Sequence, residues 1–172
     1  GSIGWKSTCA SCSPKRTAVI AVNDLITEPA SRVLLIERTL DAPRELIYKV
    51  WTEPEHLAHW WGPAQFTMPD GQMDVRPGGF YRIHIRSAEG IDYWMQGVYQ
   101  EVVEPERLVC TFSWDTPQGT RGHETTVTVL FEDLGSKTKF TFHQAVFESD
   151  SSRNDHNTGW CECFDRLAAY VV

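Results

Sequence analysis

The stretch ERTLDAPRELIYKVWTEPEHLAHWWGP, residues 37–63, decides the fold. It begins with the end of a β-rich run, which predicts a strand over about residues 32–40. Pro43 suits the first turn of a helix, because its missing N–H would have no partner there. Apolar residues then follow at helical spacing: Leu46, Ile47, Val50 and Trp51. The domain therefore opens with a strand that runs directly into a short helix.

The same stretch predicts a second short helix. Thr52 and Glu55 form a capping-box pattern at its start, and Gly62 and Pro63 end it. Its apolar stripe consists of Leu57, Trp60 and Trp61. Two adjacent tryptophans thus lie where this helix ends, and they either anchor it to the rest of the fold or face a ligand.

Beyond residue 64, the chain reads as one strand after another. Segments bounded by turn residues predict consecutive antiparallel hairpins over 65–77, 78–87, 92–105, 106–115, 123–135 and 136–147. Because side chains alternate along a strand, one face of this sheet is strongly apolar. The residues expected on that face are Tyr81, Ile83, Ile85, Leu108, Cys110, Phe112, Trp114, Val127, Val129, Phe131, Phe140 and Phe142.

A long helix is expected from about Asn154 to the end of the chain. Trp160, Phe164, Leu167 and Val171 repeat along it at steps of four, three and four residues. This is the only long helix available to cover the apolar face. We therefore predict an α+β fold with a curved antiparallel sheet of six to seven strands around a C-terminal helix, and with two short helices between strands one and two.

The length of 172 residues fits one domain. Residues 1–16 lack periodicity and begin with the Gly-Ser that expression vectors often leave, so we expect a disordered or expression-derived tail. Residues 17–31 are expected to form a weakly patterned N-terminal arm, and residues 32–172 the domain itself.

Composition excludes several classes of partner. The formal net charge is −7 and no dense Lys/Arg run occurs, which argues against nucleic-acid binding. No apolar run approaches the roughly 18 residues that span a bilayer, so we expect a cytoplasmic protein without a membrane span. Five cysteines, an odd number, favour reduced thiols. Cys9 and Cys12 lack a second pair at zinc-ligand spacing, so we expect no metal and no other cofactor.

Five ordered blocks of this sequence resemble the SRPBCC superfamily, whose START-like members have a helix-grip fold. The blocks are residues 37–63, MDVRPGGFYRI, GVYQEVVEPERLVCTFSW, TVTVLFEDLGSKTKFTFHQ and GWCECFDRLAAYV. Within the superfamily, the match is to the branch named after the activator of the heat-shock chaperone ATPase, which implies a stress-response setting. The resemblance also implies an apolar cavity between sheet and helix that takes hydrophobic or aromatic small molecules.

Eight residues are candidates for the wall of that cavity: Trp61, Phe66, Trp94, Tyr99, Trp114, His123, Trp160 and Phe164. Trp61 and Phe66 flank the Gly-Pro turn, which lies near the cavity mouth in the family. The alternation is the same whether the other aromatic rings fill the interior or line it, and both alternatives stand. Tyr99 and Trp160 carry polar tips that must find a partner if they are buried.

The six histidines raise the alternative of an enzyme. Alternation places His123 on the face of Val127 and Val129, so it is the candidate general base of a cyclase or hydrolase. His123 or His143 could form such an acid-base group with Tyr99 as its partner. No nucleophile elbow or phosphate loop is present, and we assign no catalytic residue. His56 and His59 lack a matching carboxylate and are not expected to bind metal.

Three functions are thus carried forward. The preferred one is a binding module for a hydrophobic or aromatic small molecule, because the aromatic share of 12% is high and concentrates on the inward faces. The second is the enzyme, and the third is a module that binds a chaperone, which the family name suggests. A homodimer is left open.

Overall fold

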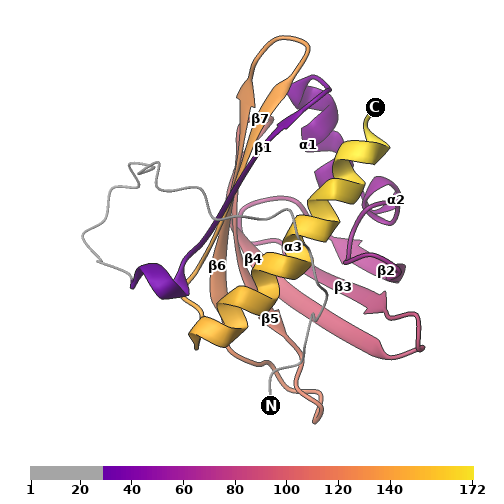
Figure 1. Ribbon diagram of the computed structural model, residues 1–172, viewed down its shortest axis with the longest axis vertical. Helices are drawn as coiled ribbons and strands as arrows, with labels where there is room; N and C mark the ends of the chain where they lie inside the picture. The colour runs from indigo at the N-terminus through magenta and orange to yellow at the C-terminus, as the bar shows by residue number, and fades with distance from the viewer. Residues whose placement is uncertain (1–28) are drawn as a thin grey trace.

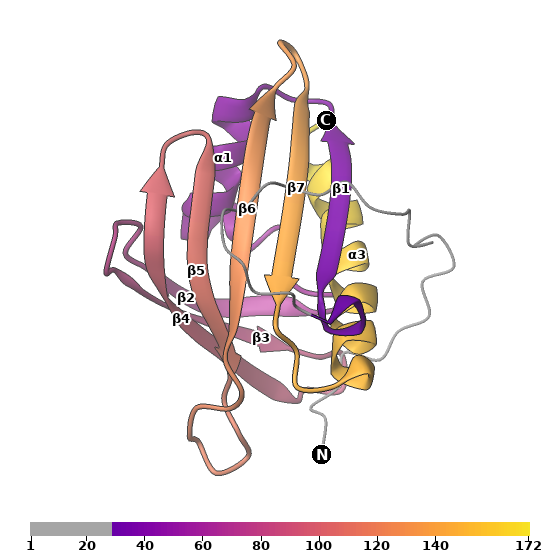
Figure 2. The same cartoon turned by 90° about the vertical axis from the view of Figure 1, so that its left-hand side faces the viewer.

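A seven-stranded antiparallel sheet forms the body of the protein in this computed structural model, which describes residues 29–172. The strands are β1 (Leu34–Leu40), β2 (Thr67–Met73), β3 (Phe80–Arg86), β4 (Asp92–Val103), β5 (Arg107–Trp114), β6 (Thr125–Asp133) and β7 (Thr138–Ala145). Their order in the sheet is β1-β7-β6-β5-β4-β3-β2. Strands adjacent in sequence are therefore adjacent in space, except that β1 crosses over to pair with β7 (Figure 2).

One long helix crosses the concave face of this sheet. It is α3 (Asp150–Tyr170), and Figure 1 shows it running diagonally over the strands. The short helices α1 (Arg44–Thr52) and α2 (Pro54–Leu57) lie between β1 and β2, and a single 3-10 turn, η1 (Ala30–Arg32), precedes β1. The predicted helix-grip architecture is confirmed, including both short helices and the strand count.

The inward face of the sheet is the predicted one. Alternating residues of β3 and β6 are buried, among them Tyr81, Ile83, Val127 and Val129. From the helix side, Trp160, Phe164 and Leu167 are buried against them. Val171 lies just beyond the end of α3, where it is half-buried and still packs against the core.

Gly97 permits a close approach between β4 and β5. A Cβ at this position would collide with the carbonyl oxygen of Thr111 on β5. The hydroxyl of Tyr81 donates a hydrogen bond to that same oxygen at 2.6 Å. Only glycine leaves room for both contacts, so Gly97 fixes where the inward-facing Tyr81 lies.

The start of the second short helix differs from the prediction. Thr52 is the last residue of α1, and its hydroxyl donates to the carbonyl oxygen of Tyr48 at 2.8 Å. It therefore does not cap α2, whose N-cap is Glu53 without a side-chain cap. Pro54 begins α2 instead, because a proline at the first helical position needs no N–H partner. The expected tail 1–16 and most of the expected arm 17–31 lie outside the described residues.

A single arginine holds the chain that leaves α2. Nη1 of Arg166, on α3, lies 3.0 to 3.3 Å from four carbonyl oxygens, those of Trp61, Gly62, Pro63 and Phe66. One turn earlier on α3, Glu162 accepts a hydrogen bond from the backbone N–H of Ala64 at 3.0 Å. Gly62 has a φ of +97°, which lets its carbonyl turn towards the guanidinium. We call these contacts of Arg166 and Glu162 the α3 clamp.

Substitution Arg166→Met is expected to lower the free energy of unfolding by about 2–4 kcal/mol, because hydrogen bonds to a charged donor are lost and partly buried carbonyls are left without it. The measurement is urea unfolding followed by tryptophan fluorescence. Arg121→Met is the control, since the contact of the Arg121 side chain among the described residues is an exposed ion pair with Glu124 at 3.5 Å, and a change within about 0.5 kcal/mol is expected there. Equal effects of the two substitutions would contradict the importance of the clamp.

Candidate functional site

The space between the sheet and α3 contains a small cavity. Its volume is about 30 Å³. The wall is made of residues from α1, the segment after α2, six strands and α3: Trp51, Trp61, Met73, Tyr81, Ile83, Tyr99, Leu108, Cys110, Phe112, Val127, Val129, Phe142 and Trp160. Aromatic and aliphatic groups dominate this wall, so it suits an apolar occupant.

Three of the eight predicted site residues line the cavity: Trp61, Tyr99 and Trp160. Phe164 is fully buried behind them and stacks on Trp160, with ring centroids 5.6 Å apart. Phe66 is half-buried near Tyr93 and does not form part of the wall. Trp114 is also half-buried. It is the last residue of β5, and its Nε1 donates to His156 Nε2 at 2.9 Å.

The expected position of Trp94 is wrong. Trp94 and Tyr99 are five residues apart on β4, so their side chains point to opposite faces of the sheet. Trp94 lies on the outer face, where it stacks on His84 with ring centroids 4.3 Å apart. The guanidinium carbon of Arg82 lies 4.6 Å from the centre of the Trp94 ring. The inward residue next to it is Met95, which is fully buried.

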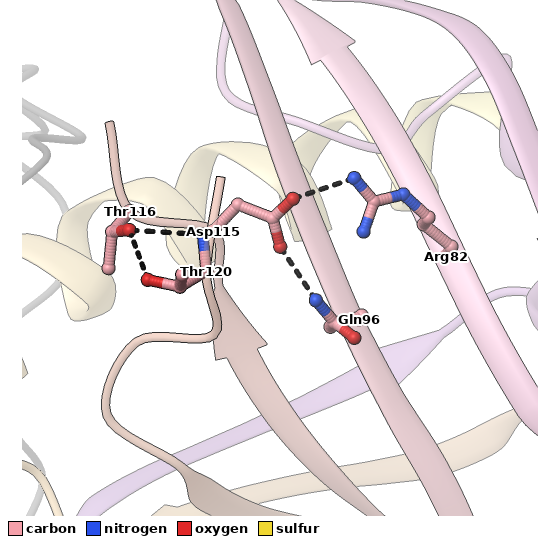
Figure 3. Close-up of polar contacts among 5 residues, drawn as sticks. All are labelled: Arg82, Gln96, Asp115, Thr116 and Thr120. Carbon is pink, nitrogen blue, oxygen red and sulfur yellow. Dashed lines mark hydrogen bonds and ion pairs between the residues drawn. The ribbon is translucent and has the colours of Figure 1, made fainter. Parts of the chain in front are cut away.

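This outer-face cluster ties down the loop between β5 and β6. Arg82 donates to a carboxylate oxygen of Asp115 at 2.6 Å, and Gln96 donates to the other oxygen at 2.7 Å (Figure 3). The hydroxyls of Thr116 and Thr120 are 2.7 Å apart and close the same loop. Each residue drawn in Figure 3 thus makes a polar contact within the protein, and the cluster supports the fold.

The expected position of His123 is also wrong. The ring is exposed, and its Nε2 lies 2.7 Å from the carbonyl oxygen of Val146. Strand β6 begins only at Thr125, so the alternation that orients Val127 does not extend back to His123. His143, the other candidate base, occupies the outward position between Phe142 and Gln144 on β7. Neither imidazole reaches the cavity.

Trp51 is a central residue that the pattern analysis assigned only to a helix. Its ring lies within 6.4 Å, centroid to centroid, of six other aromatic rings, those of Trp60, Trp61, Phe131, Phe140, Phe142 and Phe164. Trp60 is buried next to it and donates from Nε1 to the carbonyl oxygen of Val50 at 3.1 Å. Trp60 therefore anchors the segment after α2, whereas Trp61 faces the cavity.

The polar groups of the two buried side chains Trp160 and Tyr99 differ in their hydrogen bonding. Trp160 Nε1 donates to Gln144 Oε1 at 2.8 Å, and Gln144 Nε2 donates in turn to Thr125 Oγ1 at 2.8 Å. Tyr99 is only 3% exposed, yet its hydroxyl makes no hydrogen bond to any residue that the structure describes. Burial raises the pKa of Tyr99, so the hydroxyl stays protonated and can donate. Tyr99 thus presents an unused donor at the cavity wall.

A buried histidine that the sequence analysis did not single out is His156 on α3. It accepts from Trp114 through Nε2, and its Nδ1 lies 2.7 Å from the carbonyl oxygen of Ser152. These two contacts define the neutral ring with the proton on Nδ1. Its spacing of four from Trp160, which itself precedes Phe164 by four, is the signal that could have revealed its inward position.

The remaining titratable candidates lie elsewhere. His56 Nδ1 is 2.8 Å from the Tyr170 hydroxyl, and the ring of His59 stacks on Tyr170. Within residues 29–172, no three His, Cys, Asp or Glu side chains lie close enough to hold a metal ion. Cys161 is disulfide-bonded, so the expectation of reduced thiols is wrong for this residue, and Cys9 and Cys12 lie outside the described residues. No described helix has the length and apolarity needed to cross a membrane.

Comparison with known proteins agrees with this architecture. The profile of the family described as Activator of Hsp90 ATPase homolog 1-like protein matches residues 41–172. A Chromobacterium violaceum crystal structure is 25% identical, covers 81% of this chain and 96% of its own, and superposes with a TM-score of 0.72. An AHSA1 protein of Silicibacter pomeroyi is 24% identical over 80% of this chain and 95% of its own, also with a TM-score of 0.72. The search of curated protein sequences gives no significant match.

Stability is expected to fall on acidification because of His156. Burial lowers the pKa of His156 below its ordinary value of 6.5, so between the lowered pKa and 6.5 the unfolded state binds more protons than the native state. Its contribution is therefore fully present above pH 6.5 and is lost as pH falls towards the lowered pKa. Urea unfolding at pH 7.5 and pH 5.5 measures the change. His156→Gln should lose less stability between these two values than the wild type, and an identical loss would contradict the assignment.

Proposed function

The chain belongs to the family of Activator of Hsp90 ATPase homolog 1-like proteins, and we propose that it binds a small aromatic molecule between its sheet and α3. The observation that carries the proposal is the hydroxyl of Tyr99. The Tyr99 side chain is only 3% exposed and lines the cavity, and its hydroxyl, which has no partner among the described residues, is available to a ligand there. A ligand with one acceptor atom and an apolar ring would satisfy it and match the rest of the wall.

The occupant must enlarge the cavity that it enters. A volume of about 30 Å³ holds roughly one water molecule, which is far less than an aromatic ring needs. Met73 forms part of the wall at the end of the edge strand β2 and is only half-buried. Its unbranched side chain has several rotatable bonds, so it can move aside more easily than a tryptophan. We therefore place the opening beside Met73.

The enzyme alternative has little support. Both candidate bases, His123 and His143, lie away from the cavity, and both ring nitrogens of His156 already have partners. A general base needs a free nitrogen within reach of a substrate proton. A binding role without turnover agrees better with these contacts. Chaperone binding, a cytoplasmic location and homodimerisation stay predictions of the sequence.

Acetophenone and α-methylstyrene are suitable probes, because they have nearly the same shape and only the first has an acceptor oxygen. Isothermal titration calorimetry should show acetophenone binding about three- to tenfold more tightly, as expected of one neutral hydrogen bond. Tyr99→Phe should remove this difference while leaving α-methylstyrene binding unchanged. Equal binding of the two probes to the wild type would refute the role of Tyr99.

A cavity-filling substitution tests the location separately. Val129→Phe adds a ring to the wall and should abolish binding of both probes. Thr126→Phe adds the same ring at an exposed position of β6 and is the matched control. Thermal unfolding checks that Val129→Phe remains folded, since overpacking costs about 1–3 kcal/mol. If both variants bind as the wild type does, the site is not between the sheet and α3.

A further inference from the structure

A second, larger depression lies outside the apolar interior. It is an open groove of about 630 Å³ between α1, the loop after β2 and the turn that joins β4 to β5. Figure 2 shows α1 at the same end of the molecule as that turn. The lining residues, which we call the α1 groove, are Glu45, Tyr48, Lys49, Thr52, Glu53, Val75, Glu104 and Pro105. Its volume falls within the range of about 300–1,000 Å³ that is usual for small-molecule sites.

The charge of the α1 groove is negative. Three carboxylates, those of Glu45, Glu53 and Glu104, face one ammonium, that of Lys49, which leaves two net negative charges. Glu104 forms no ion pair with any described residue. The partners of the other two carboxylates are distant, since Glu45 is 4.0 Å from Arg44 and Glu53 is 3.5 Å from His56. The groove therefore has unused capacity to attract a cation.

An independent observation at the same place is the side chain of Tyr48. It is only 6% exposed and packs edge-on against Phe131, with ring centroids 5.6 Å apart. Its hydroxyl makes no hydrogen bond to any residue in the described range, and the residue lines the groove. Burial, and next the charge of Glu104, raise the pKa of Tyr48, and both residues line the groove. An otherwise enclosed side chain thus presents at the groove a hydroxyl that has no partner among the described residues.

The geometry selects an organic cation over a metal ion. Among the described residues, these carboxylates do not come close enough together to hold a metal ion. A divalent metal needs several oxygens within about 2.6 Å of one point. The groove instead offers dispersed carboxylates together with the apolar surfaces of Val75 and Pro105. This combination suits a charged group joined to a small apolar body.

We propose that the α1 groove binds a small organic cation, in which an ammonium group lies between Glu104 and the Tyr48 hydroxyl and a short apolar body contacts Val75 and Pro105. The inference does not rest on ligand binding between the sheet and α3, because none of the groove residues lines that cavity. The two sites would differ in their ligands. The interior would take a neutral ring, and the groove a cation.

The test is a titration of the ¹⁵N-labelled protein with phenethylamine, which is protonated at pH 7, and with 2-phenylethanol, its neutral counterpart. Phenethylamine should shift the amide resonances of Lys49, Glu53 and Glu104 and bind at least about fivefold more tightly than the alcohol, with an affinity that weakens as salt is added. Equal binding of the two probes, or shifts confined to other surfaces, would overturn the proposal.

Matched variants separate the groove from the overall charge of the protein. Glu104→Gln should weaken phenethylamine binding about two- to fivefold, as expected of a partly exposed ion pair. Glu106→Gln removes the same charge two residues away, at a side chain that pairs with Arg44 at 3.8 Å and is absent from the groove wall, and should have no effect. Tyr48→Phe should weaken binding, and Lys49→Gln should strengthen it. Equal effects of Glu104→Gln and Glu106→Gln would overturn the assignment.

Discussion

The guanidinium of Arg166 is the contact on which the arrangement of the interior depends. Through four carbonyl oxygens it holds the segment from Trp61 to Phe66 against α3. That segment carries Trp61 into the interior, where its ring lies 5.2 Å from that of Trp160 on the same helix. The α3 clamp therefore sets the distance between a loop and a helix about a hundred residues apart in sequence. Without it, one wall of the cavity would have no fixed position.

Aromatic packing then decides how much space remains inside. The rings around Trp51 interlock closely, and only about 30 Å³ is left between the sheet and α3. Rings that fill a core stabilise it, and the same rings would have to separate to admit a ligand. Tyr99 and Met73 are the exceptions, since one has an unused donor and the other a pliable side chain. At these two residues the core contains a hydroxyl that a ligand can use and a side chain that can move to admit it, instead of tightly packed rings that only stabilise the fold.

Much of the fold could be predicted from the sequence because alternation and helical spacing are local signals. They placed Tyr99, Trp160 and Phe164 inside, and two short helices between the first two strands. The same reasoning failed for His123, where the strand begins two residues later, and for Trp94, whose odd separation from Tyr99 on one strand places it on the other face. The Trp94 error was avoidable, because both residues lie in the predicted strand 92–105 and their separation of five can be read from the sequence. The His123 error depends on the exact start of β6, which the pattern does not supply.

Other features depend on distant contacts that leave no local signal. Arg166 reads as an ordinary helix residue, because its partners are backbone carbonyls, which every residue possesses. The α1 groove is lined by both Tyr48 and Glu104, which are 56 residues apart, and nothing near either residue in the sequence indicates that they line one groove. Contacts and grooves of this kind can be recognised only once the order of the strands in the sheet is known. The folded domain then has two chemically different candidate sites, the apolar cavity between the sheet and α3 and the acidic α1 groove.

The proposed entry of a small aromatic molecule between the sheet and α3 can be observed by nuclear magnetic resonance. Intermolecular nuclear Overhauser effects between acetophenone and the methyl groups of the labelled protein would show where the ring lies. We expect contacts to the methyl groups of Leu108, Val127 and Val129, which line the cavity. Contacts at saturating acetophenone that reach only exposed methyl groups, such as those of Leu134, would contradict it.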